Sequence, residues 1–156
     1  MASLYGLTLK NITRYKGHEG EPLQQGNIYY EGKKIGFYSD GDWGRPSTID
    51  FDNPEAEKAA LAACKKYYTD YPQDRWSKDY EPDLEEFFPK VFQFIDWEKY
   101  YKKMLKKGYL VLGLYQKGIH EVRTAGRLED AVREALKKAD AENPKIFTGL
   151  EDFILS

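Results

Sequence analysis

The sequence predicts an α+β fold: one domain over residues 1–156, with an antiparallel sheet packed with three to four helices. Three observations favour this class. Apolar residues alternate with polar ones near the amino end and again near residue 110, which is typical of strands. Helix-forming segments with start signals lie between and after these strands. The length of 156 residues fits one domain, and no low-complexity tract or long linker divides the chain.

The amino-terminal strands are expected to form a meander. Leu7 and Leu9 alternate with polar residues, which predicts a half-buried strand over residues 7–12. After a polar loop, residues 26–40 contain two aromatic or β-branched runs separated by Glu31 and Gly32, a pattern that indicates a hairpin. Three strands in series would then pair antiparallel.

The middle of the chain is expected to be helical. Pro54 follows Asn53, and good helix formers continue to about Asp70, so we predict a helix over residues 54–70. A second helical segment begins near Asp83. Pro89 is expected to divide it into a short helix and a longer one that Asp96 caps.

The carboxy-terminal third is again expected to contain a hairpin followed by a helix. A second hairpin is expected to turn near residues 117–118, and an amphipathic helix is expected over residues 127–143. Ile146 and Phe147 would add a further strand. We expect all strands to join one antiparallel sheet.

Composition narrows the functional classes. The chain has 24 basic and 26 acidic side chains, so no overall field attracts it to nucleic acid or to anionic lipid. Cys64 is the only cysteine, which excludes an internal disulfide and cysteine-based zinc clusters. No segment approaches the about 18 apolar residues of a membrane span, and no signal-peptide pattern is present, so we expect a cytoplasmic protein. No glycine-rich segment matches a phosphate-binding pattern, and we expect no cofactor.

Enzymatic signatures are weak throughout. Four aspartates follow the first hairpin: Asp40, Asp42, Asp50 and Asp52. Their carboxylates could bind a divalent cation, as in a small metal-dependent hydrolase or nuclease, or could accept backbone hydrogen bonds in turns. His18, with two nearby glutamates, could bind a metal or form loop hydrogen bonds. Whether the protein is an enzyme stays open, and a non-catalytic role is favoured.

Two surfaces are predicted to bind another macromolecule. The first is the loop after the hairpin, with Asp40, Asp42, Trp43 and Arg45. The second is the acidic segment 70–98, which has nine acidic and three basic side chains interleaved with aromatic ones. Its candidate residues are Trp76, Asp79, Tyr80, Glu81, Asp83, Glu85 and Glu86. Acids would steer the protein towards a basic groove and rings would anchor it, although a solvated helix face explains the same pattern.

A basic segment gives a further alternative. Residues 99–107 carry several lysines beside Tyr100 and Tyr101, and lysines with tyrosines can contact nucleic acid. Helix capping also explains these lysines. Nucleic acid is therefore a less expected partner than protein, and no membrane partner is expected.

The first hairpin resembles small uncharacterised proteins of bacteriophages and other mobile elements. In those proteins a strand leads to a hairpin with a tyrosine before Gly-Lys-Lys and then to a loop with serine, aspartate and glycine. The matching positions are Tyr30, Gly32, Lys33, Lys34, Gly36, Ser39, Asp40 and Gly44. The resemblance covers residues 7–52, and residues 43–46 depart from the paired glycines that are frequent in those proteins. It implies an accessory protein that binds and inhibits a host protein, such as a bacterial defence effector. The acidic segment would suit a host protein that itself binds nucleic acid.

Overall fold

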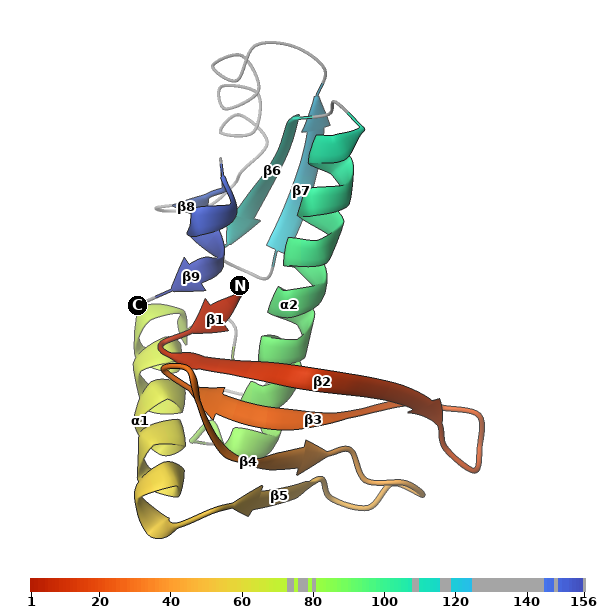
Figure 1. Cartoon of the computed structure of the whole chain (residues 1–156), viewed down its shortest axis with the longest axis vertical. Helices are drawn as coiled ribbons and strands as arrows, with labels where there is room; N and C mark the ends of the chain where they lie inside the picture. Colours follow the sequence, from red (N-terminus) through yellow and green to blue (C-terminus); the bar gives the residue numbers. More distant parts are fainter. Residues whose placement is uncertain are drawn as a thin grey trace.

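The protein has an α+β fold built along one long helix, α2 (Leu84–Lys106). The computed structural model describes residues 1–72, 75, 79, 81–107, 110–115, 119–124, 145–147 and 149–155. A six-stranded sheet lies at one end of α2 and a three-stranded sheet lies at the other (Figure 1). The predicted α+β class is therefore confirmed, whereas the predicted three to four helices exceed the two α-helices of the described residues.

The six-stranded sheet contains most of the amino-terminal half of the chain. Its strands are β1 (Ser3–Leu4), β2 (Leu7–Lys16), β3 (Pro22–Tyr30), β4 (Lys33–Ser39), β5 (Thr48–Phe51) and β9 (Ile154–Leu155). Their order is β5-β4-β3-β2-β1-β9, and all neighbours are antiparallel except β1 and β9. The expected meander is confirmed, and β5, which the sequence did not suggest, extends it.

The β3–β4 hairpin has the turn expected at Glu31 and Gly32. Both residues have positive φ, 47° and 85°, as the common two-residue hairpin turns require. The loop that was expected after residue 12 is shorter in the structure. Strands β2 and β3 stay paired from Leu7, opposite Tyr30, to Lys16, opposite Pro22. A bulge between Lys10 and Thr13 interrupts this ladder.

Helix α1 (Pro54–Asp70) confirms the predicted start and end. The Asn53 side chain accepts a hydrogen bond of 2.8 Å from the Ala56 backbone, which satisfies one of the free N–H groups of the first turn. Ala56, Ala60 and Ala63 are buried. Their small side chains let the helix approach the sheet closely.

The predicted break at Pro89 is wrong, because α2 runs unbroken from Leu84 to Lys106. Pro89 lies in the second turn, where its missing N–H deprives only the Glu85 carbonyl of a helical partner. Asp83 caps this helix by accepting a hydrogen bond of 2.9 Å from the Glu86 backbone. Asp96 lies in mid-helix, and the prediction that it caps a helix is therefore also wrong.

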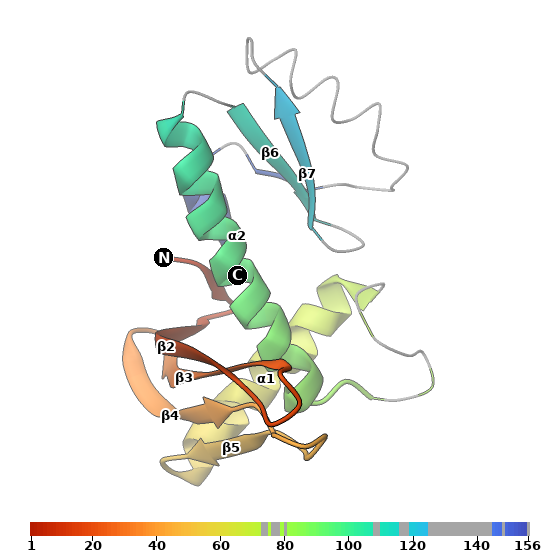
Figure 2. The ribbon, with the colours of Figure 1, turned by 90° about the vertical axis from the view of Figure 1, so that its right-hand side faces the viewer.

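The expectation of a single antiparallel sheet is wrong as well. Strands β6 (Leu110–Tyr115), β7 (Ile119–Thr124) and β8 (Lys145–Ile146) form a separate sheet in the order β7-β6-β8. Helix α2 is about 34 Å long at 1.5 Å per residue, so it carries the chain away from the first sheet before β6 begins (Figure 2). The second hairpin and the strand at Ile146 are confirmed. The described part of the chain holds two α-helices and the 3₁₀ helix η2 (Leu150–Phe153), and the helix expected over residues 127–143 lies outside it.

Both helices cover the same face of the six-stranded sheet. Tyr38 of β4 stacks against Phe88 and Phe92 of α2, with ring centroids 5.2 and 5.4 Å apart. Further along α2, Phe94 packs against Phe147 and Phe153 near the carboxyl end. One cluster of buried side chains thus runs the length of α2. Neither described helix is long and apolar enough to cross a membrane.

Candidate functional site

Two loops meet at the end of the six-stranded sheet that projects away from α1. The β2–β3 loop (residues 17–21) and the β4–β5 loop (residues 40–47) lie at this end because Lys16 pairs with Pro22 and Ser39 pairs with Thr48. We call these two loops together the tip. In Figure 1 the tip is the right-hand end of the sheet. The tip contains the first of the two surfaces predicted from the sequence.

Asp42 joins the two loops. Its Oδ2 lies 2.5 Å from Nδ1 of His18, and its Oδ1 accepts a hydrogen bond of 3.1 Å from the His18 backbone. Oδ1 also accepts a hydrogen bond of 2.8 Å from the Trp43 backbone. Desolvation acts to raise the pKa of Asp42, but the bonds from His18, with smaller contributions from Glu21 and Trp43, outweigh it and lower this pKa to about 2. The contact therefore depends on an ionised Asp42.

Glu21 brings a second carboxylate to the same place. Its Oε2 accepts a hydrogen bond of 2.9 Å from the Glu19 backbone, and its other oxygen lies over Gly17. A Cβ at Gly17 would overlap Glu21 and would lie 2.7 Å from Oδ1 of Asp42. Glycine at position 17 therefore lets both carboxylates converge on the β2–β3 loop.

Trp43 is the most prominent apolar side chain of the tip. It is 58% exposed, and its φ of 61° lies in the left-handed region that few large residues adopt. Its ring centroid lies 4.8 Å from that of His18. The next two residues complete a tight turn, in which the Arg45 backbone donates to the Asp42 carbonyl at 3.1 Å. The loop thus holds an exposed indole in one position, with the exposed Arg45 beside it.

Both carboxylate oxygens of Asp40 accept hydrogen bonds from the sheet. Its Oδ1 accepts a hydrogen bond of 2.7 Å from the Tyr38 hydroxyl, and its Oδ2 accepts one of 3.0 Å from the Gln24 backbone. Tyr38 is fully buried, and burial raises the pKa of its hydroxyl well above the ordinary value. The Asp40 carboxylate therefore fixes the base of the β4–β5 loop.

The acidic segment is divided among different environments. Asp83 caps α2, and Glu86 is only 6% exposed. Glu85 accepts a hydrogen bond of 2.8 Å from the Ser47 backbone, so it ties the start of α2 to the β4–β5 loop. Asp79 and Glu81 are exposed, whereas Trp76 and Tyr80 lie outside the described residues. The two predicted surfaces thus meet at the contact between Ser47 and Glu85. Several of the acidic side chains lie at the start of α2, where they stabilise the fold.

The remaining aspartates and Cys64 do not form a catalytic cluster with the tip. Asp50 on β5 and Asp52 after it are exposed. Among the residues that the structure describes, no group of three or more histidine, cysteine or acidic side chains is placed to hold a metal ion. Cys64 is buried in α1, and burial raises the pKa of its thiol to about 12, which disfavours the reactive thiolate.

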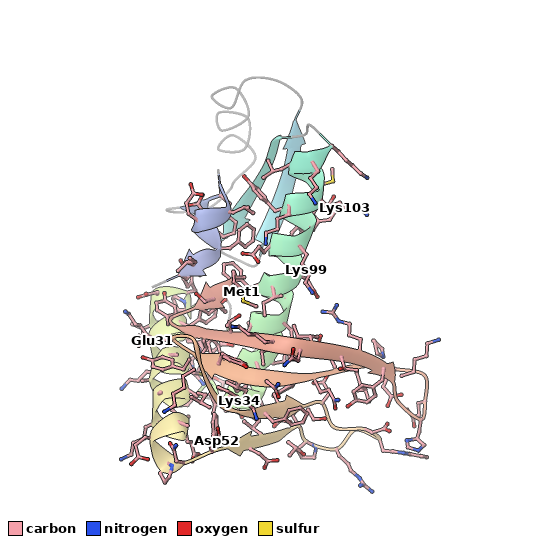
Figure 3. All side chains as sticks on the ribbon, in the orientation of Figure 1. Met1, Glu31, Lys34, Asp52, Lys99 and Lys103 are labelled. Atoms are coloured by element: carbon pink, nitrogen blue, oxygen red, sulfur yellow. The ribbon has the colours of Figure 1, made fainter. Side chains whose placement is uncertain are left out.

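The basic segment forms the solvent side of the second half of α2. Tyr101 is buried, so it is not available to stack on a base. Lys102 lies 3.6 Å from the buried Glu98, and Lys103 and Lys106 occupy the last helical turn, where cations stabilise the helix dipole. Lys99 and Lys103 project from α2 into solvent (Figure 3).

The pairing of His18 with Asp42 is the part of the site that sequence reasoning missed. It also missed Arg14, whose guanidinium Nη2 binds both carboxylate oxygens of Asp96 at 2.6 and 2.7 Å. The register of the β2–β3 and β4–β5 ladders is the signal that would have placed both loops at one end of the sheet.

Comparison with known proteins supplies no relative for this site. No protein-family model matches the chain, and no curated protein or solved structure matches it significantly.

Proposed function

We propose that the protein is a non-catalytic binding protein that attaches to a partner protein through the tip. The observation that carries this proposal is the exposed and fixed side chain of Trp43. Tryptophan and arginine are the residues that most often dominate binding energy in interfaces, and Arg45 lies two residues from Trp43.

The geometry of the tip favours binding over catalysis. His18, Asp42 and the left-handed turn hold the indole before any partner arrives, so less conformational entropy is lost on association. The carboxylates of Asp40 and Asp42 accept hydrogen bonds from the fold itself. This supports recognition more than the alternative of a metal-dependent hydrolase.

The proposed partner is a host protein in the bacterial cytoplasm, such as a defence effector that the protein inhibits. The resemblance of residues 7–52 to phage accessory proteins supports this choice. The exposed Asp79 and Glu81 suit a partner with a basic groove, because charges on the rim of an interface accelerate association.

A comparison of three baits tests the proposal. Wild-type protein, Trp43→Ala and Leu61→Ala are immobilised and exposed to bacterial lysate, and the captured proteins are identified by mass spectrometry. Leu61 is a matched control because it is 46% exposed but lies on α1. We expect wild type and Leu61→Ala to capture the same partner and Trp43→Ala to lose it. Equal capture by all three baits would contradict the proposal.

A further inference from the structure

Among the strands that the structure describes, none pairs with the outer part of β2 on the side away from β3. Strand β1 pairs with β2 only at Leu7, and β3 occupies the opposite side of β2 along its whole length. Figure 1 shows β1 ending beside one end of β2, while the rest of β2 continues past α2 towards the tip without a labelled strand on that side. We call residues 11–16 the free edge.

The backbone of the free edge points outwards at defined residues. Gln24, which pairs with Arg14, directs its backbone towards β4, because its N–H donates to Asp40 and its carbonyl accepts from the Asp40 backbone. In an antiparallel pair, opposite residues direct their backbone groups either both inwards or both outwards. The N–H and carbonyl of Arg14 therefore point away from β3, and so do those of Lys16 two residues further on.

The free edge carries basic side chains, one of which, Arg14, is already paired with Asp96 of α2. Residues 10–16 contain Lys10, Arg14 and Lys16 and no acid. The side chains of Arg14 and Lys16 lie on one face of β2, and that of Tyr15 lies on the other. A pocket of about 430 Å³ at the end of this edge is lined by Arg14, Lys16 and Gln24 as well as by Tyr15, Pro22 and Leu23. A strand added here would meet Lys16 and the ion pair of Arg14 with Asp96 on one face, and Tyr15 on the other.

From this arrangement we propose that the free edge binds an extended, acidic segment of another protein as an additional strand. Main-chain hydrogen bonds would join Arg14 and Lys16 to that segment, as in other cases of strand addition. Its preferred pattern alternates acidic side chains, which would face Lys16 and compete with Asp96 for Arg14, with an apolar one that packs on Tyr15. Pairing with a second copy is disfavoured, since lysines and bulges on edge strands oppose pairing between identical edges. The inference goes beyond the tip and stands even if Trp43 takes no part in binding.

The test uses two synthetic eight-residue peptides, one of alternating glutamate and valine and the other with lysine replacing glutamate. Amide shifts of the isotope-labelled full chain are followed by NMR during titration. We expect the glutamate peptide to bind at least tenfold more tightly, with shifts at residues 13–16, and Trp43→Ala to bind it as wild type does. Equal binding of both peptides, or shifts confined to other residues, would overturn the proposal.

A proline substitution isolates the backbone contribution. Arg14→Pro removes an outward N–H without breaking the β2–β3 ladder, and Arg14→Ala removes the same side chain but keeps that N–H. We expect Arg14→Pro to bind the glutamate peptide about fivefold more weakly than Arg14→Ala. If Arg14→Pro does not fold, Lys16→Pro and Lys16→Ala give the same comparison. Equal affinities within the pair, or a concentration-dependent dimer in sedimentation equilibrium that the proline variant abolishes, would overturn the assignment.

Discussion

The two ends of the six-stranded sheet are held together by different forces. At the end near α1, Leu7, Leu9 and Ile28 are fully buried, and the shape of the sheet is fixed by packing. At the tip, His18 and Trp43 are exposed, and the shape is fixed by a few hydrogen bonds between two loops. The comparison teaches that changes in the packed end should alter stability, whereas changes at the tip should alter binding with little effect on stability.

The largest effect is expected from the packed end. Phe88→Ala would remove a fully buried ring from α2 and leave a cavity beside Tyr38. We expect the free energy of unfolding to fall by about 3–5 kcal/mol in urea denaturation followed by circular dichroism. Leu61→Ala, on the exposed side of α1, should change it by less than about 0.5 kcal/mol. Similar losses for both variants would remove the distinction between packed and exposed regions.

A smaller effect is expected where the packed end meets the tip. Tyr38→Phe keeps the buried ring but removes the hydroxyl that donates to Asp40 and lies 3.0 Å from the Ser47 hydroxyl. We expect a loss of about 1–3 kcal/mol in the same denaturation, because Asp40 loses one of its hydrogen-bond donors. Tyr29→Phe is the control, since Tyr29 is only half-buried and keeps its ring contact with Lys10. An unchanged stability in Tyr38→Phe would show that packing alone fixes the base of the loop.

At the tip, we expect acid to break the contact between His18 and Asp42. The pKa of Asp42 is lowered to about 2, so the contact with His18 is fully present above the ordinary carboxyl pKa and is lost as the pH falls through about 2. NMR titration of the Asp42 side-chain carbon should show a midpoint near 2. In His18→Ala the midpoint should rise towards about 3.9, the value of a free aspartate. A midpoint that stays near 2 in His18→Ala would show that other groups hold the carboxylate.

The smallest effect is expected from the ion pair between Arg14 and Asp96. Both side chains are nearly half-exposed, at 48% and 46%, so solvent screens their attraction. A double-mutant cycle with Arg14→Ala and Asp96→Ala should give a coupling energy of at most about 1 kcal/mol, decreasing with added salt. A larger, salt-independent value would mean that this contact belongs with the packed end.

Short sequence motifs were enough to predict the elements whose boundaries are set by neighbouring residues. Asn53 and Pro54 set the start of α1, and Glu31 with Gly32 set the β3–β4 turn. The helix start near Asp83 was predicted correctly, but Pro89 misled the prediction, because a proline in the second turn removes one hydrogen bond without ending the helix. Strand β5 was missed because four residues give too short a pattern to stand out.

The tip shows why the site was only partly predicted. Trp43 and Arg45 were named as candidates because they lie in the loop after the first hairpin. The contact between His18 and Asp42 spans 24 positions of the sequence. It depends on the registers of β2 with β3 and of β3 with β4, in which a slip of one residue would separate the loops.

The position of α2 has a consequence for how the chain folds as it is synthesised. Strands β1 to β5 are complete by residue 51, but the rings that cover Tyr38 belong to Phe88 and Phe92. A nascent chain that has left the ribosome only as far as α1 therefore lacks the rings of α2 that cover Tyr38. The amino-terminal meander must wait for the later helix, and during that interval its apolar face is available to chaperones.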